Sequence, residues 1–134
     1  MKATELYKNE ILRISKENRE KRMELIIKER DCEINYLKQR SAIRDKRSSE
    51  YAKYKVACSI ADQHAIDAHM KKLNEIEDEE LFLKSEYKAQ QKMFEIERSE
   101  LQSNLITEQI IAKQKFKSMS GQEIENPSDE LNWL

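Results

Sequence analysis

The second half of the chain carries the clearest hydrophobic pattern, which is a heptad repeat. Apolar residues recur every three or four positions on the two core columns of one frame, typical of a helix with a buried seam. One column holds Leu73, Tyr87, Phe94 and Leu101, and the other holds Ile76, Leu83 and Ile111. Polar residues occupy further core slots: Glu80, Gln90, Glu97, Asn104 and Glu108. The spacing predicts a helix over residues 62–117 with an imperfect seam, as expected when its partner helix is not identical.

The first half of the chain carries a less regular stripe. Tyr7, Ile11 and Ile14 begin it, and the stretch 15–22 is wholly polar. The stripe resumes with Met23, Ile26, Ile27, Ile34 and Leu37, and after a second polar stretch at 44–50 it continues with Tyr51, Tyr54, Cys58 and Ala61. This pattern predicts one helix over residues 4–58, either bent or frayed at the polar stretches or simply exposed there.

The expected turn between these helices lies near residues 59–62. Ser59-Ile60-Ala61-Asp62 has the S-x-x-D form of a helix N-terminal capping signal, and Asp62 could itself cap the following helix. The distribution of charge along the chain also supports a turn at this point. Residues 1–60 carry 16 Lys and Arg against 10 Asp and Glu, whereas residues 61–134 carry 9 against 16. A turn near residue 61 therefore lays a basic helix against an acidic one.

The charges also match locally. The acidic cluster at 75–80 faces Arg44, Lys46 and Arg47 when the chain is reflected through residue 61, with Arg40 close by. Such flanking ion pairs contribute only about 0.3–0.5 kcal/mol each, but they select orientation and register. We expect an all-α fold of two long helices in an antiparallel coiled-coil hairpin over residues 1–117. A single long helix that forms a parallel dimer is the main alternative.

Composition agrees with long helices. Charged residues make up 38% of the 134 residues, aromatic residues 7%, and the single Gly and single Pro are Gly121 and Pro127. Disorder is the competing interpretation of high charge and few aromatics, but the net charge is only -1 and the apolar spacing is helical. Gly121 suits a helix C-cap and Pro127 blocks continuation, so we expect residues 118–134 to form a flexible tail.

No residue pattern indicates catalysis, a metal or a cofactor. His64 and His69 do not share a helix face, and Cys58 does not complete a zinc spacing with them. There is no Gly-rich phosphate loop, and the basic stretch 38–47 has an acidic helix available to neutralise it, so we expect no nucleic-acid binding. No apolar run spans a membrane and no signal peptide is evident, so we expect a cytoplasmic protein with free thiols at Cys32 and Cys58.

The sequence suggests two contact regions for protein partners. Tyr51, Tyr54 and Ile66 lie near the expected turn and would form an adhesive tip if they are not packed on the opposite helix. In the tail, Leu131, Trp133 and Leu134 stand beside two acidic residues, and an acidic aromatic terminal segment can dock in a partner's groove.

The size, the two charged helical arms and the stretch Arg98-Ser99-Glu100-Leu101-Gln102-Ser103-Asn104 resemble the YscO/FliJ family of type III secretion and flagellar export. Some YscO-type proteins have a similar R-S-E-L-Q run before their C-terminus. The resemblance implies a non-catalytic cytoplasmic stalk, monomeric alone, that links a hexameric ATPase to the export gate and handles secretion chaperones. Two alternatives stay open: a coiled-coil chaperone or adaptor for a secreted partner, and a dimeric coiled-coil scaffold.

Overall fold

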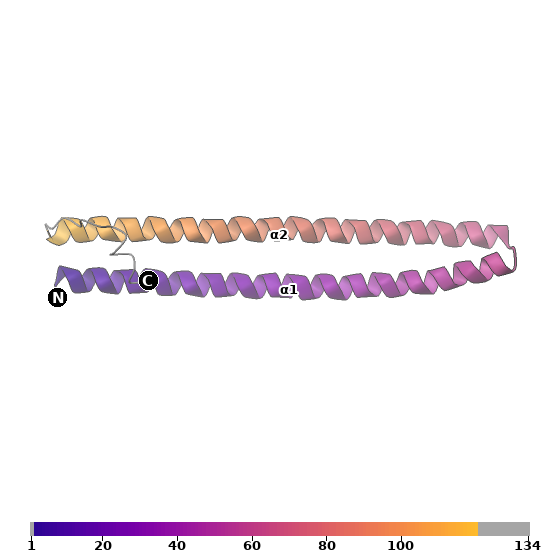
Figure 1. Ribbon diagram of the computed structural model, residues 1–134, viewed down its shortest axis with the longest axis horizontal. Helices are drawn as coiled ribbons and strands as arrows, with labels where there is room; N and C mark the ends of the chain where they lie inside the picture. The colour runs from indigo at the N-terminus through magenta and orange to yellow at the C-terminus, as the bar shows by residue number, and fades with distance from the viewer. Residues whose placement is uncertain (1, 121–134) are drawn as a thin grey trace. The chain divides into compact units, whose positions relative to one another are not determined.

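The computed structural model describes residues 2–120, which form two long helices joined by a short turn (Figure 1). Helix α1 spans Ala3–Ser59 and helix α2 spans Gln63–Ser120. The two helices run antiparallel and pack on each other, and none of the residues 2–120 lies in a strand. The predicted all-α, antiparallel two-helix hairpin is confirmed.

Helix α2 continues past the point where the sequence analysis expected it to end. Residues 118–120, which the sequence analysis assigned to the tail, are the last residues of α2. Nothing in these three residues breaks a helix, because the first Gly of the chain is Gly121. The rest of the expected tail, with Leu131, Trp133 and Leu134, lies outside the described residues.

The chain forms two compact units, and both helices contribute to each. Of the described residues, 2–27 and 94–120 make up one, which we call the terminal unit. Residues 28–93 make up the other, which we call the turn unit. In each unit a segment of α1 packs on a segment of α2.

The terminal unit contains the main apolar core. Tyr7, Ile11 and Ile14 of α1 pack on Ala112 and Phe116 of α2. The Tyr7 and Phe116 rings stack with centroids 4.8 Å apart, and Ile11 is 0% exposed. Full burial of an aliphatic side chain contributes about 1.5–3 kcal/mol, so this small cluster is a large part of the unit's stability.

The α2 side of this core departs from the predicted heptad frame. Leu101 is half-buried as expected, but Ile111 is 46% exposed and Ala112 is buried in its place, so the assignment of Ile111 to the core is wrong. After Leu101 the inward positions are Leu105, Gln109 and Ala112, an eleven-residue step in place of a heptad step. A straight α-helix has 3.6 residues per turn, whereas a heptad repeat has 3.5, so residues spaced by seven gradually rotate away from α1. Four additional residues between two core positions bring the core positions back to the side of α2 that faces α1.

Two polar side chains are buried in the seam of the terminal unit. Asn18, in the polar stretch 15–22, donates a hydrogen bond from Nδ2 to the carbonyl oxygen of Leu101 at 3.0 Å. Gln109 is 4% exposed. α1 stays helical through both polar stretches of the sequence, and in the first of them the seam continues through a hydrogen-bonded amide. A buried amide of this kind lowers stability and favours one register over others.

The seam of the turn unit mixes apolar positions with polar and charged ones. Ala57, Ile76 and Leu83 are its buried apolar residues. The Tyr36 and Tyr87 rings stack across the seam with centroids 4.1 Å apart. Half-buried or buried polar positions of α1 alternate with these contacts: Cys32, Arg40, Arg47 and Glu50. This unit therefore associates through stacked rings and paired charges as much as through hydrophobic contact.

The apolar stripe predicted for the middle of α1 is wrong, because it lies outside the seam. Met23, Ile26, Ile27, Ile34 and Leu37 are 41–59% exposed. The inward positions over the same stretch are Leu25, Glu29, Cys32 and Tyr36. α1 is one unbroken helix, so the positions that face α2 at its start determine which later positions face α2. Leu25 follows Asn18 by one heptad, whereas Ile26 and Ile27 do not.

The predicted charge match in the turn unit is confirmed for two basic residues. Lys46 Nζ lies 3.2 Å from Glu79 Oε1, and Arg47 pairs with Glu80. Arg44 is exposed, and the guanidinium of Arg40 lies over the Tyr36 ring, 5.6 Å from its centroid. These contacts set the antiparallel register of the turn unit, although each exposed ion pair adds little stability.

The turn at residues 60–62 is a Schellman motif. The Asp62 N–H donates to the Ala57 carbonyl at 3.1 Å, and the Ala61 N–H donates to the Cys58 carbonyl at 3.2 Å. Ala61 adopts φ 54°, the left-handed region that glycine normally occupies. Asp62 Oδ1 accepts from the Ala65 N–H and so caps α2, whereas the Ser59 hydroxyl donates back to the Val56 carbonyl.

Replacing Ala61 with Gly is expected to stabilise the protein by about 0.5–1 kcal/mol, because the left-handed conformation costs a residue with a Cβ about 1–2 kcal/mol and Gly loses some of that gain in chain entropy. Urea denaturation followed by circular dichroism measures the change. Ala89→Gly at an exposed helical position is the matched control, with an expected loss of about 1 kcal/mol. A loss of stability in Ala61→Gly would contradict the motif.

Candidate interaction surfaces

No chemical centre stands out along the two helices. Among residues 2–120, no three His, Cys, Asp or Glu side chains are grouped so that they could hold a metal ion. Neither α1 nor α2, within the part of the chain that the structure describes, is apolar enough over a sufficient length to cross a membrane. Cys32 is half-buried, Cys58 is exposed, and both are free thiols. The candidate sites are therefore surfaces.

The predicted contact residues at the turn divide between the surface and the seam. Tyr51 is 47% exposed, whereas Tyr54 and Ile66 are half-buried. The Tyr51 and Tyr54 rings stack with centroids 6.1 Å apart, and Lys55 Nζ lies 4.9 Å from the Tyr51 centroid. Tyr51 is thus available to a partner, while the other two are partly covered by the hairpin itself.

A second apolar feature at the turn was not anticipated from the sequence. Val56 is 61% exposed and Ile60 is 67% exposed, and both line a shallow hollow of about 380 Å³ with Ala52, Ala57 and Ala65. The signal in the sequence was their spacing of four, which places both on one side of the last turns of α1. This hollow and Tyr51 together make the turn end of the turn unit partly apolar.

His69 contacts a buried carboxylate beside that hollow. Glu50 Oε1 lies 2.5 Å from His69 Nδ1, and Glu50 is 7% exposed. The pKa of Glu50 is lowered, mainly by the hydrogen bond from His69, with the charges of Lys72 and Lys53 acting in the same direction. The ionised form of Glu50 is therefore favoured by folding.

This contact predicts a specific loss of stability in acid. A carboxylate whose pKa is lower when folded stabilises the protein above its unfolded pKa, and that stabilisation disappears as pH falls through the folded pKa. We expect the urea midpoint of the wild type to exceed that of Glu50→Gln at pH 7. The difference should shrink on acidification from about pH 5 downward. Exposed Glu79→Gln is the control, and an unchanged difference at low pH would contradict the prediction.

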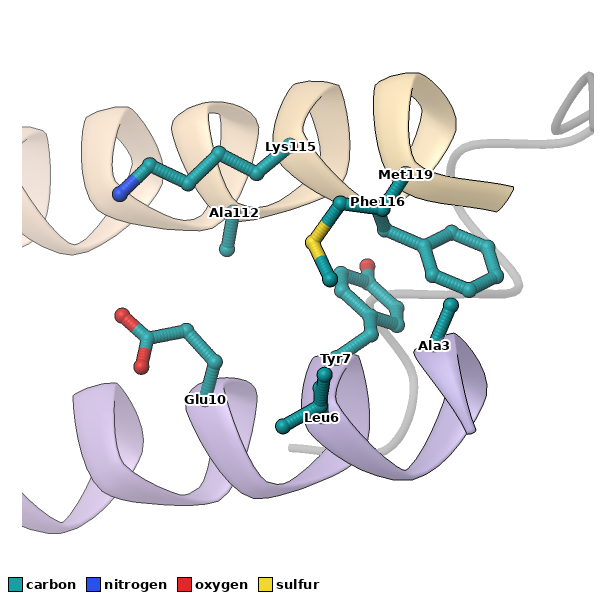
Figure 2. A pocket seen from close by; sticks show the side chains of 8 residues that line it. All are labelled: Ala3, Leu6, Tyr7, Glu10, Ala112, Lys115, Phe116 and Met119. Atoms are coloured by element: carbon teal, nitrogen blue, oxygen red, sulfur yellow. The ribbon is translucent and has the colours of Figure 1, made fainter. Parts of the chain in front are cut away.

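At the other ends of the helices, the terminal unit has a hollow of about 290 Å³ (Figure 2). Leu6, Tyr7 and Glu10 of α1 face Ala112, Lys115, Phe116 and Met119 of α2 across it. Tyr7 and Phe116 form its apolar wall, and the side chains of Glu10 and Lys115 lie on the same side of the unit. The hollow is open, so it is a surface groove on the core.

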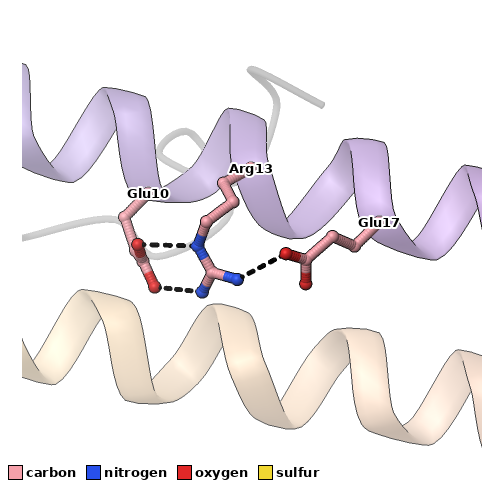
Figure 3. Close-up of polar contacts among 3 residues, drawn as sticks. All are labelled: Glu10, Arg13 and Glu17. Atoms are coloured by element: carbon pink, nitrogen blue, oxygen red, sulfur yellow. Dashed lines mark hydrogen bonds and ion pairs between the residues drawn. The ribbon is translucent and has the colours of Figure 1, made fainter.

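An ion cluster on α1 flanks this groove. Arg13 donates to Glu10 from Nε at 3.0 Å and from Nη2 at 2.5 Å, and to Glu17 from Nη1 at 2.9 Å (Figure 3). The hydrogen bond from Arg13 is the main cause of a lowered pKa at Glu10, and Lys115 contributes less. All three residues of the cluster are exposed or half-buried, so it orders the surface more than it stabilises the fold.

Many large apolar side chains lie outside the seam. Those of the terminal unit that are at least 41% exposed are Leu6, Leu12, Met23, Ile26, Ile27, Ile96, Ile106, Ile110, Ile111 and Met119. Those of the turn unit include Ile34, Leu37, Met70, Leu81, Phe82 and Met93. Single exposed apolar residues are ordinary, but groups of them on one helix face mark interaction sites.

The stretch that carries the family resemblance lies on α2 in the terminal unit. Leu101 is half-buried in the seam, and its carbonyl accepts the hydrogen bond from Asn18. The other six residues of Arg98–Asn104 are exposed. The run therefore has a seam position and an outward face.

Comparisons with protein-family models, with curated protein sequences and with solved structures find no match for this chain.

Proposed function

We propose that the protein is a non-catalytic helical-hairpin protein that binds other proteins, and that it serves as the stalk of a type III secretion export apparatus. In that role it links a hexameric ATPase to the export gate in the cytoplasm and also handles secretion chaperones. One observation carries the general part of the proposal: large apolar side chains lie on the outer faces of both helices, while polar side chains occupy much of the seam. Removal of such apolar side chains from water is favourable, and on the outer faces it happens only when a partner covers them.

The specific role rests on the resemblance and on the fold together. An antiparallel hairpin with a mixed charged surface suits a stalk that makes weak, exchangeable contacts. The run Arg98–Asn104 supports the same assignment, because six of its seven side chains are exposed and can contact a partner without unfolding the helix.

The test is reconstitution with a purified type III secretion ATPase. We expect the full-length protein to bind the ATPase and to raise its turnover or its hexamer content, measured by phosphate release and analytical ultracentrifugation. A variant with Glu100→Lys and Gln102→Lys alters only exposed positions of the run and should bind more weakly. No binding to the ATPase, and no binding to the export gate, would contradict the stalk assignment.

The second candidate is an adaptor for a secreted partner, and the charged positions in the seam of the turn unit favour it. Arg40, Arg47 and Glu50 are buried or half-buried there, and charged side chains in a seam reduce the apolar area that the two helices bury on each other. An adaptor of this kind would gain helix protection when its partner binds. Hydrogen exchange of residues 28–93 distinguishes the two, because a stalk is protected when alone and an adaptor is protected only in the complex.

A further inference from the structure

The groove of Figure 2 leaves two of its apolar side chains largely uncovered. Leu6 is 41% exposed and Met119 is 60% exposed. The stacked rings of Tyr7 and Phe116 line the same hollow. Apolar side chains that converge on one hollow from two helices can all be removed from water by a single covering group. The groove is therefore suited to a large apolar side chain from another segment.

The groove is also short. Its lining residues lie within 3–10 of α1 and 112–119 of α2, which is about two turns of each helix. A partner helix that binds along a groove needs apolar anchors over a longer stretch, whereas one or two side chains of a non-helical segment fit within two turns. The groove therefore favours a short segment with a large apolar side chain over a helix.

Residues 121–134 begin beside this groove. Helix α2 ends at Ser120, and the preceding residue, Met119, is part of the lining. Leu131 follows Ser120 by eleven residues. Such a stretch can span up to about 36 Å when it is extended, whereas Phe116 lies only about 6 Å back along α2 from Ser120. The segment is therefore long enough to return to the groove.

The charge of residues 121–134 complements that of the helix ends around the groove. The segment has four acidic residues and no Lys or Arg, whereas residues 2–10 and 111–120 together have five Lys and two Glu. Of these seven, Lys115 and Glu10 line the groove, and the Glu10 carboxylate is bound by Arg13. Unlike charges therefore attract the segment to this end of the terminal unit.

We propose that the groove of the terminal unit binds residues 121–134 of the same chain, with Trp133 as the side chain that covers it. The indole packs against the Tyr7 and Phe116 rings, a contact that aromatic side chains favour. Because segment and groove belong to one molecule, the effective concentration of the segment is on the order of 1 mM. A contact with a Kd of about 1 mM between separate molecules is then half formed within the chain.

This contact has a consequence for partners. Leu131, Trp133 and Leu134 are the residues of the segment that the sequence predicts to dock on another protein. A partner that binds them competes with the groove, so its apparent affinity is reduced by the fraction of molecules in which the segment is bound internally. The inference goes beyond the proposed function and does not depend on the stalk role.

Trp133 is the single tryptophan of the chain, so its fluorescence reports this contact directly. The experiment measures the emission maximum and the acrylamide quenching of the full-length protein. A synthetic peptide of residues 121–134 is the reference for a solvent-exposed indole. We expect emission of the protein at shorter wavelength than that of the peptide, and quenching at least about twofold weaker, as half occupancy requires. Added salt should reduce the difference, because charges contribute to the attraction.

Two leucines of α1 provide a matched pair of variants. Leu6 lines the groove and is 41% exposed, whereas Leu12 is 46% exposed and is not part of the lining. Leu6→Glu should raise the quenching of Trp133 to nearly that of the peptide, and Leu12→Glu should leave it nearly unchanged. Only the first removes apolar area from the groove and places a like charge in it.

Two lysines of α2 provide a second pair, which serves if Leu6→Glu disturbs the helices. Lys115 lines the groove and Lys117 does not. Lys115→Glu should increase the quenching of Trp133 more than Lys117→Glu does, although both change the net charge equally. Circular dichroism verifies that each variant stays helical.

Three results would overturn the inference: quenching of the folded protein equal to that of the peptide, equal effects within both pairs of variants, or protection of Trp133 that disappears on dilution. The last would assign the groove to the segment of a second copy, because a contact within one chain does not depend on protein concentration. Protected Trp133 without any effect of the protein on the secretion ATPase would sustain this inference while contradicting the stalk assignment.

Discussion

Replacing Ile11 with Ala is expected to lower the free energy of unfolding by about 3 kcal/mol, within the 2–5 kcal/mol range for such truncations in a core. Ile11 is 0% exposed and lies at the centre of the cluster formed with Tyr7, Ile14, Ala112 and Phe116. Two long helices provide few atoms that can move in to fill the vacated volume. Urea denaturation monitored by circular dichroism measures the change.

The adjacent residue is the control for this prediction. Leu12 is 46% exposed, so Leu12→Ala should change the free energy of unfolding by no more than about 0.5 kcal/mol. Both substitutions introduce Ala, which has the highest helix propensity, so the difference between them reports burial. Equal losses at the two positions would contradict the seam of the terminal unit.

The second large effect is expected at Leu25. It is 4% exposed on the seam of the terminal unit, and Leu25→Ala should cost about 2–3 kcal/mol. Ile27, which is 52% exposed, should tolerate the same truncation within about 0.5 kcal/mol. The two variants are made and measured in the same urea titration, at one temperature and one salt concentration.

This pair tests the orientation of α1 directly. The hydrophobic pattern of the sequence assigned Ile26 and Ile27 to the seam, and the structure assigns Leu25. A larger loss at Ile27 than at Leu25 would mean that α1 is rotated about its axis relative to the structure. It would also place Met23 and Ile26 inside the seam.

Much of the fold could be predicted from local chemistry. The absence of Gly and Pro before residue 121 predicts long uninterrupted helices, because these residues are the strongest local breakers. The antiparallel pairing followed from the opposite charges of the two halves, and the ion pairs of Lys46 and Arg47 with Glu79 and Glu80 bear it out. On α2, the heptad assignments of Ile76 and Leu83 are confirmed by their burial.

The outer surfaces were harder to predict, because a helix can carry two apolar stripes. Ile34 and Leu37 have the spacing of seam residues, yet Tyr36 is the residue that meets Tyr87. Spacing alone cannot separate a stripe that faces the partner helix from one that faces solvent. Of the predicted contact residues, Tyr51 is exposed. The exposed apolar side chains in the middle of α1, such as Met23 and Ile26, were missed as surface groups because they had been assigned to the seam.

The sequence by itself determined that this protein is helical, where the chain reverses direction, and that the basic first half of the chain attracts the acidic second half. Those properties depend on neighbouring residues and on total charge, which are local or additive quantities. Only the tertiary structure decided which stripe of α1 is inside, where the heptad frame of α2 shifts to Ala112, and that Ala61 occupies the left-handed region at the turn. The first two depend on the rotation of each helix about its own axis, whereas the conformation of Ala61 is fixed by the hydrogen bonds of the turn. That rotation is chosen by all contacts of the pair at once, through the Tyr7–Phe116 and Tyr36–Tyr87 stacks and the buried amide of Asn18.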